Sequence, residues 1–144
     1  MPGHVVHGPQ LVQVVQLPGT VPLSCVCLNV NGDLVVTREC PEMIECMNGN
    51  DIVLFSETWT NEHSNLDIDD FNVFSKHRVK KKNARRDSGG LVCYFRKNVA
   101  KGVSEIKWLF EDGMCFKLDK DYFGWERDVI QCVQIKAPVF KPRF

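Results

Sequence analysis

The stretch Asp51-Ile52-Val53-Leu54-Phe55-Ser56-Glu57-Thr58-Trp59 decides the fold, because a run of apolar residues leads directly into a carboxylate. A short apolar run of this kind predicts a buried strand. Glu57 then stands where the strand leaves its sheet, at the edge where open α/β sheets commonly bind ligands. A strand that simply ends at the protein surface would explain Glu57 equally well.

Two asparagines mark the end of a second predicted strand, in Leu28-Asn29-Val30-Asn31-Gly32. Because side chains alternate along a strand, Asn29 and Asn31 share one face with Cys25 and Cys27. Val26, Leu28 and Val30 take the other face. Amide and carboxylate oxygens suit a hard cation or a cation-bound phosphate. We therefore expect Asn29, Asn31 and Glu57 to converge at one edge of a sheet.

A predicted helix separates these two strands. Its apolar residues follow the i, i+3, i+4, i+7 spacing of an amphipathic helix, with a proline suited to the first turn and a glycine to the end: Cys40, Met43, Ile44 and Met47, with Pro41 and Gly49. A strand over 23–30, this helix and the strand before Glu57 predict a βαβ-like start. Further short strands are expected over 71–75, 90–96, 114–118 and 129–135.

Three segments, in this order, resemble the first motifs of the endonuclease/exonuclease/phosphatase superfamily. They are Leu28-Asn29-Val30-Asn31-Gly32, the stretch from Asp51 to Trp59, and Asp87-Ser88-Gly89-Gly90-Leu91-Val92-Cys93-Tyr94. The residues of these segments are most similar to those of the endonuclease domains of non-LTR retrotransposons. The resemblance covers roughly residues 23 to 138.

The resemblance implies an α/β fold, a four-layer α/β sandwich with a mixed sheet, and a Mg²⁺ ion that helps to hydrolyse phosphodiester bonds. Glu57 matches the glutamate that binds the metal, and Asn29 matches the asparagine that supports the site through hydrogen bonds. Asn31 falls where many members carry Asp or Asn near the metal. An asparagine there keeps a carbonyl ligand and loses a charge.

The later motifs of that family, a Gly-Asp-x-Asn segment and a Ser-Asp-His segment, do not occur in this sequence. In the family, these residues position the nucleophile and complete the acid–base and phosphate contacts. Removing members of a catalytic unit that acts together abolishes nearly all of the rate enhancement. We therefore expect the N-terminal half of such a domain, inactive on its own.

The composition bounds the protein class. With 144 residues, 44% of them hydrophobic, and a formal net charge of zero, we expect at most one globular domain and no global affinity for nucleic acid. Seven cysteines, an odd number, and the lack of a signal-peptide pattern predict reduced thiols in an intracellular protein, nuclear or cytoplasmic and not secreted. We expect a loose leader over 1–20, a partial domain over 21–138 and a tail over 139–144.

A basic run lies between two predicted strands. It contains six cations within nine residues: Arg78, Lys80, Lys81, Lys82, Arg85 and Arg86. The run is a candidate for phosphate contacts with DNA or another phosphodiester substrate. A solvated loop and a nuclear-localisation-like patch explain it as well.

Three functional hypotheses remain open on the sequence. The first is a Mg²⁺-dependent phosphodiesterase, an endonuclease by ancestry. The alternative is a non-catalytic remnant that binds nucleic acid or a protein partner through residues 78–86. The third is a half domain that associates with another chain through an exposed sheet edge. None of the three involves a membrane.

Overall fold

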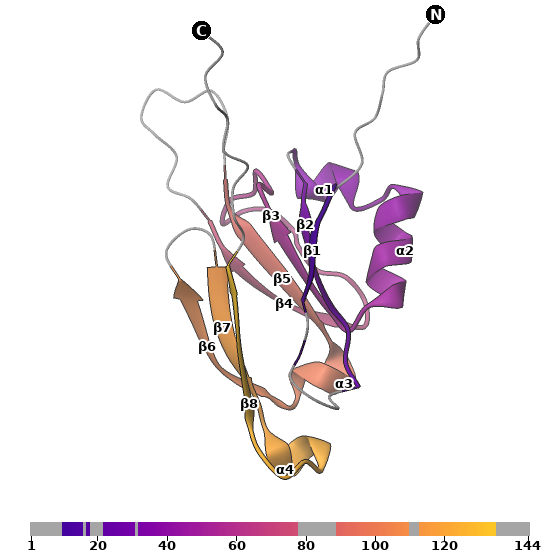
Figure 1. Cartoon of the computed structure of the whole chain (residues 1–144). Coiled ribbons are helices and arrows are strands. Elements are labelled where there is room, and N and C mark those ends of the chain that lie inside the picture. The colour runs from indigo at the N-terminus through magenta and orange to yellow at the C-terminus, as the bar shows by residue number, and fades with distance from the viewer. Residues whose placement is uncertain are drawn as a thin grey trace, which may run out of the picture.

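The computed structural model of this chain describes residues 10–15, 17, 22–30, 32–77, 89–109 and 113–134. These residues form two β-sheets and four helices (Figure 1). The α/β class expected from the sequence is confirmed, with one mixed and one antiparallel sheet.

The larger sheet has five strands in the order β1-β2-β3-β5-β4, which are β1 (Gln10–Val15), β2 (Cys25–Asn29), β3 (Ile52–Ser56), β5 (Leu91–Arg96) and β4 (Phe71–Lys76). The smaller sheet has the order β6-β7-β8, which are β6 (Val103–Leu109), β7 (Gly113–Leu118) and β8 (Val129–Gln134). The helices are α1 (Leu34–Thr37), α2 (Pro41–Gly49), α3 (Lys97–Ala100) and α4 (Lys120–Phe123).

Strands β2 and β3 form the parallel pair of the larger sheet, and α1 and α2 connect them, as the βαβ-like start requires. All five residues of β3 are buried, because both faces of this central strand are covered. The other strand pairs of this sheet are antiparallel.

Helix α2 confirms the predicted boundaries at Pro41 and Gly49. Pro41 occupies the first turn, where its missing N–H leaves no hydrogen bond unmade. Met43 and Met47 are buried against the sheet, whereas 49% of Ile44 is exposed. The predicted apolar stripe was therefore too wide by one position.

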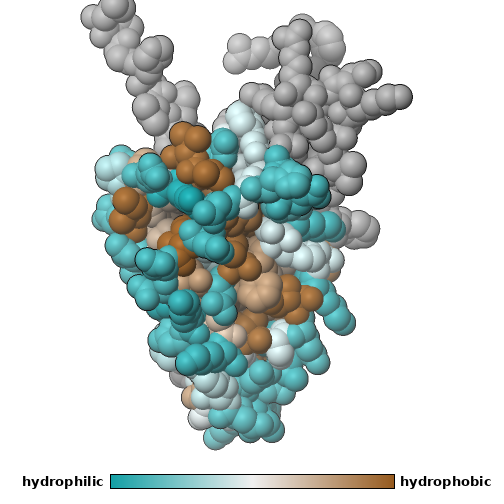
Figure 2. Space-filling model, turned by 180° about the vertical axis from the view of Figure 1, so that it is seen from behind, coloured by the Kyte–Doolittle hydropathy of each residue, from teal (hydrophilic) through white to brown (hydrophobic). Residues whose placement is uncertain are grey.

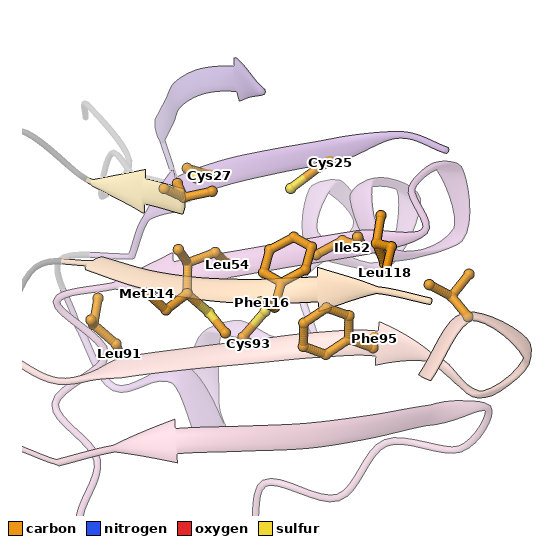
Figure 3. Packing of buried hydrophobic residues seen from close by; sticks show 12 residues of the cluster. Cys25, Cys27, Ile52, Leu54, Leu91, Cys93, Phe95, Met114, Phe116 and Leu118 are labelled. Carbon is orange, nitrogen blue, oxygen red and sulfur yellow. The ribbon is translucent and has the colours of Figure 1, made fainter. Parts of the chain in front are cut away.

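The first hydrophobic core lies between the two sheets (Figure 3). Alternate residues of the large sheet face inward, and β7 supplies the opposing layer: Cys25, Cys27, Ile52, Leu54, Leu91, Cys93 and Phe95 meet Met114, Phe116 and Leu118. The rings of Phe95 and Phe116 meet edge to face at 5.2 Å. Cys25 and Cys27 are small residues of this core.

The second core lies on the opposite face of the large sheet. There Val26, Leu28 and Val30 pack with Leu34 of α1 and with the methionines of α2. The molecule is therefore layered, with helices α1 and α2, then the five-stranded sheet, then the three-stranded sheet (Figure 1).

The sequence-based expectations were wrong at three further places. Residues 10–15, expected within a loose leader, form β1 and pair antiparallel with β2. Strand β6 was not expected. Cys115 and Cys132, expected as free thiols, form a disulfide. The basic run at 78–86 and the expected tail at 139–144 lie outside the described residues.

The surface carries scattered apolar side chains. Seen from behind, apolar residues lie among hydrophilic ones in the upper and middle parts of the molecule, and the lower end is mostly hydrophilic (Figure 2). The exposed large apolar residues of the described ranges are Val36, Ile44, Phe74, Tyr122 and Ile130. Among the helices of those ranges, none has the length and apolar character needed to cross a membrane.

Candidate functional site

Glu57 directly follows β3 and leaves the strand in an unusual backbone conformation. Its φ is 51°, and that of Trp59 is 49°, so two non-glycine residues lie in the left-handed region. Each such residue costs about 1–2 kcal/mol. Strain of this kind persists where the surrounding structure enforces it, and it is common at functional sites.

The chain after β2 runs beside this segment. Val30 N donates to Ser56 O at 2.9 Å, Gly32 N to Glu57 O at 3.2 Å, and Leu34 N to Thr58 O at 2.9 Å. The main chain on both sides of Asn31 is therefore bonded to the main chain around Glu57. Asn31 itself lies outside the described residues.

Asn29 is the last residue of β2, and its register partner is Ser56, the residue before Glu57. The Oδ1 atom of Asn29 is buried and has no hydrogen-bond partner. An unsatisfied buried acceptor costs about 1–3 kcal/mol. The structure therefore brings the strand ends of Asn29 and Glu57 together and leaves one buried amide oxygen without a hydrogen-bond donor.

A hydrogen-bonded series of hydroxyls and one histidine continues from this edge, and no sequence pattern predicted it. Thr58 Oγ1 and Thr60 Oγ1 share a hydrogen bond at 2.9 Å, and both residues are buried. Thr60 Oγ1 lies 3.3 Å from His77 Nδ1, and His77 Nε2 lies 3.2 Å from Ser75 Oγ. These hydrogen bonds connect the segment after Glu57 to the end of β4.

The glycine pair before β5 closes the same region. Gly90 has φ +91°, and a Cβ atom there would lie 2.8 Å from Thr58 Oγ1. Trp59 N donates to Gly89 O at 3.1 Å. The glycine pair therefore allows β5 to begin close to the segment that carries Glu57.

The described residues before and after the basic run lie at this edge of the sheet. Register pairs Ser56 of β3 with Leu91 of β5, and Leu91 with Lys76 of β4. The described residues on either side of 78–88 therefore lie at the edge where Glu57 leaves β3. The positions of Arg78, Lys80, Lys81, Lys82, Arg85 and Arg86 themselves are outside the described ranges.

Glu57 and Asn29 offer a carboxylate and an amide oxygen at this edge. In the described ranges, no group of three or more His, Cys, Asp or Glu side chains is arranged to hold a metal ion. A cation here would be bound by one carboxylate, Glu57, together with amide oxygens. Mg²⁺ is often held by one or two carboxylates and completed by water and substrate phosphate. The donor set and the unpartnered Asn29 oxygen fit such an ion.

Comparisons with protein-family models, with curated proteins and with solved structures found no match to this chain.

Proposed function

We propose that the edge where β2 and β3 end is the metal-binding half of a phosphodiester-hydrolysing site of the endonuclease type. The observation that carries the proposal is Glu57, held in a left-handed conformation at the end of a buried strand. It stands beside the strand end of Asn29, whose buried side-chain oxygen has no partner.

In this proposal the two sheets and the helices are part of a four-layer α/β sandwich. The arrangement of helices, five-stranded sheet and three-stranded sheet supports this, because it supplies three successive layers. The three sequence segments that resemble the superfamily fall at the end of β2, at the end of β3 and at the start of β5.

Mg²⁺ would be held by Glu57 with help from Asn29 and Asn31, and when bound it would polarise a phosphate oxygen of the substrate. The chain's own residues have distinct tasks. The carboxylate of Glu57 neutralises positive charge, and the asparagines orient the site through their amide groups. Thr58 and Thr60, linked to His77, hold the Glu57 segment in place.

These 144 residues should not turn over substrate alone. General acid–base catalysis contributes about 10²–10⁴-fold per step. The family residues that supply it belong to the Gly-Asp-x-Asn and Ser-Asp-His motifs, and this sequence contains neither. The proposed activity of the chain by itself is therefore weak binding of metal and phosphodiester, without cleavage.

The alternative is binding of nucleic acid through the basic run, without hydrolysis. One observation favours it: the described residues on both sides of the run lie at the sheet edge of Glu57. A polyanion bound by residues 78–86 would therefore lie next to this edge. Its affinity should fall steeply with salt, because cation–phosphate contacts release counterions.

A cleavage and binding assay separates these functions. We expect no nicking of supercoiled plasmid by the wild type above the level of Glu57→Gln, with either Mg²⁺ or Mn²⁺. We expect salt-sensitive DNA binding that is lost when Lys80, Lys81, Lys82, Arg85 and Arg86 are changed to glutamine. The matched control changes five exposed cations elsewhere: Lys97, Lys101, Lys107, Lys120 and Arg127.

One result would contradict the expected inactivity, and another would contradict the alternative. Nicking that disappears in Glu57→Gln would show that the chain is an active nuclease. DNA binding that is unaffected by salt, or reduced equally by both sets of substitutions, would remove the specific role of the basic run.

A further inference from the structure

Cys115 of β7 and Cys132 of β8 are register partners on neighbouring antiparallel strands. Their Cα atoms lie 4.0 Å apart, and their sulfurs are bonded. The pair lies in the middle of the ladder, with two residue pairs on one side and three on the other. Main-chain hydrogen bonds therefore align the two strands independently of the sulfur–sulfur bond.

The pair lies on the face of the small sheet that points away from the core. On β7, Met114, Phe116 and Leu118 are buried against the large sheet, so Cys115 takes the opposite face. Cys132 is exposed on β8, the edge strand in the order β6-β7-β8. A small thiol or disulfide in solution can therefore reach this sulfur.

Four of the other five cysteines are unsuited to this chemistry. Cys25, Cys27 and Cys93 are buried in the core between the sheets, where loss of hydration raises the pKa of each thiol, to about 12 for Cys27. Burial also raises the pKa of Cys46. Because the thiolate is the reactive form, these groups exchange slowly.

The pattern differs from that of a disulfide-stabilised domain. Small secreted domains pair most of their cysteines, whereas this chain has one bridge on its surface and five free thiols. Such a set is expected of a chain that meets reducing conditions, in which an exposed bridge opens and closes.

We propose that Cys115 and Cys132 form a reversible dithiol–disulfide site that exchanges with a low-molecular-weight disulfide of the glutathione class, and that its redox state controls how firmly strand β8 is held.

The exchange is balanced without any further reactant. The thiolate of Cys132 attacks one sulfur of glutathione disulfide, which forms a mixed disulfide and releases one glutathione thiolate. The thiolate of Cys115 then attacks the Cys132 sulfur and releases the second glutathione thiolate. The two protons lost by the protein thiols pass to the two glutathione thiolates, and two electrons move from the protein to glutathione.

Beyond its main-chain ladder with β7, strand β8 places few side chains in the core, so the bridge adds to what holds the strand. Val133 is the one buried residue of β8. Lys117 Nζ lies 3.7 Å from Asp128 Oδ2, which ties the start of the strand to β7. Closing a loop over 17 residues of sequence restricts the opened chain, so the bridged form should open less often.

A redox titration of the wild-type protein tests the proposal directly. The chain is equilibrated in glutathione buffers from fully reduced to fully oxidised, the free thiols are alkylated, and the products are mapped by mass spectrometry. We expect one two-electron equilibrium and one bridge, between Cys115 and Cys132. Cys132→Ser and Cys115→Ser should form no internal bridge, and Cys40→Ser should behave as the wild type.

Hydrogen exchange supplies the second measurement on the same samples. Oxidation should slow the amide exchange of β8 by about tenfold or more and leave β3 and β5 unchanged. Three results would overturn the proposal: a pair that stays reduced in glutathione disulfide, a bridge that persists in excess reduced glutathione, or equal exchange of β8 in both states. None of these depends on the stability of a variant or on the phosphodiester proposal.

Discussion

A Cβ atom on Gly90 would lie 2.8 Å from Oγ1 of Thr58, so these two residues of distant segments are in direct contact. Thr58 follows the candidate metal ligand Glu57, and Gly90 precedes β5. The contact joins the end of β3 to the described residues that follow the basic run. Adding one methyl group at Gly90 therefore tests how closely the segments at this edge of the sheet are packed.

Gly90→Ala should destabilise the protein by about 2–3 kcal/mol, because alanine is strained at φ +91° and its Cβ meets Thr58 Oγ1. Urea unfolding followed by circular dichroism measures the loss. Gly49→Ala is the matched control, since nothing lies within 4 Å of a Cβ there. That control should change the stability by no more than about 1 kcal/mol.

The steric part of this loss is separable from the backbone part. In a double-mutant cycle, Thr58→Ala should cost less in the Gly90→Ala background than in the wild type, because it removes the clashing hydroxyl. Strictly additive losses would mean that Gly90 is required only for its backbone conformation.

The raised pKa of Tyr94 predicts that the protein loses stability at alkaline pH. Its side chain is buried, and its hydroxyl donates to Leu66 O at 2.6 Å. Burial raises the pKa of Tyr94 to about 12, against a lowering by the Arg38 guanidinium. The unfolded chain ionises near pH 10. The neutral Tyr94 hydroxyl therefore makes its full contribution to the free energy of unfolding below about pH 10. This contribution is lost as the pH rises toward 12.

Tyr94→Phe should lower stability at neutral pH by about 1–3 kcal/mol, because Leu66 O loses its donor. It should also flatten the decline above about pH 10. Buried thiols such as Cys27, whose pKa is raised by burial, titrate in the same direction. The comparison is therefore made against Tyr122→Phe at an exposed position, and equal alkaline slopes would refute the role of Tyr94.

Arg96 is expected to hold the end of α2 on the large sheet. Its Nη2 donates to Met47 O and Asn50 O at 3.0 Å and to Asn48 O at 3.2 Å. These carbonyls belong to the end of a helix without a basic residue in its last turn. Its Nε lies 3.8 Å from Asp51 Oδ1.

Arg96→Lys should therefore cost about 1–2 kcal/mol, because a lysine has one nitrogen and cannot hold these carbonyls and the Asp51 carboxylate from two separate nitrogens. Lys101→Ala, at an exposed position, should stay within about 0.5 kcal/mol of the wild type. Thermal unfolding of both variants measures the difference. An Arg96→Lys protein as stable as the control would show that the Arg96 hydrogen bonds do not stabilise the end of α2.

Phe116 should be the main link between the two sheets. It is 1% exposed and packs edge to face on Phe95. Phe116→Ala should cost about 3–5 kcal/mol, whereas Ile130→Ala, at a residue 66% exposed, should cost less than about 0.5 kcal/mol. A loss below about 1 kcal/mol for Phe116→Ala, or two separate unfolding transitions in the wild type, would mean that the sheets fold independently.

The strands and the helix with strong local patterns could be predicted from the sequence. The apolar run of β3, the alternation of β2 and the Pro41–Gly49 limits of α2 are local signals, and each is confirmed. Strand β6 escaped because Glu105 has φ 51° and the register shifts between Ser104 and Lys107, which breaks the two-residue period. Strand β1 contains a similar shift between Leu11 and Gln13.

Part of the candidate site could likewise be predicted from the sequence, and part could not. The neighbourhood of Asn29 and Glu57 follows from two strand ends that belong to one parallel pair. The chain from Thr58 and Thr60 to His77 does not, because it requires the position of β4, which sequence spacing leaves open. The Cys115–Cys132 pair likewise depends on the register of two strands separated by α4.

Binding of Mn²⁺, followed by the broadening of amide signals in two-dimensional NMR, tests the central claim most directly. We predict that low Mn²⁺ broadens the signals of Asn29, Val30, Glu57 and Thr58 first. The same titration of Glu57→Gln should lose this local effect, and Glu62→Gln, at an exposed position, should retain it. Broadening that is unchanged in Glu57→Gln, or centred on the acidic segment 67–70, would contradict a metal site at the ends of β2 and β3.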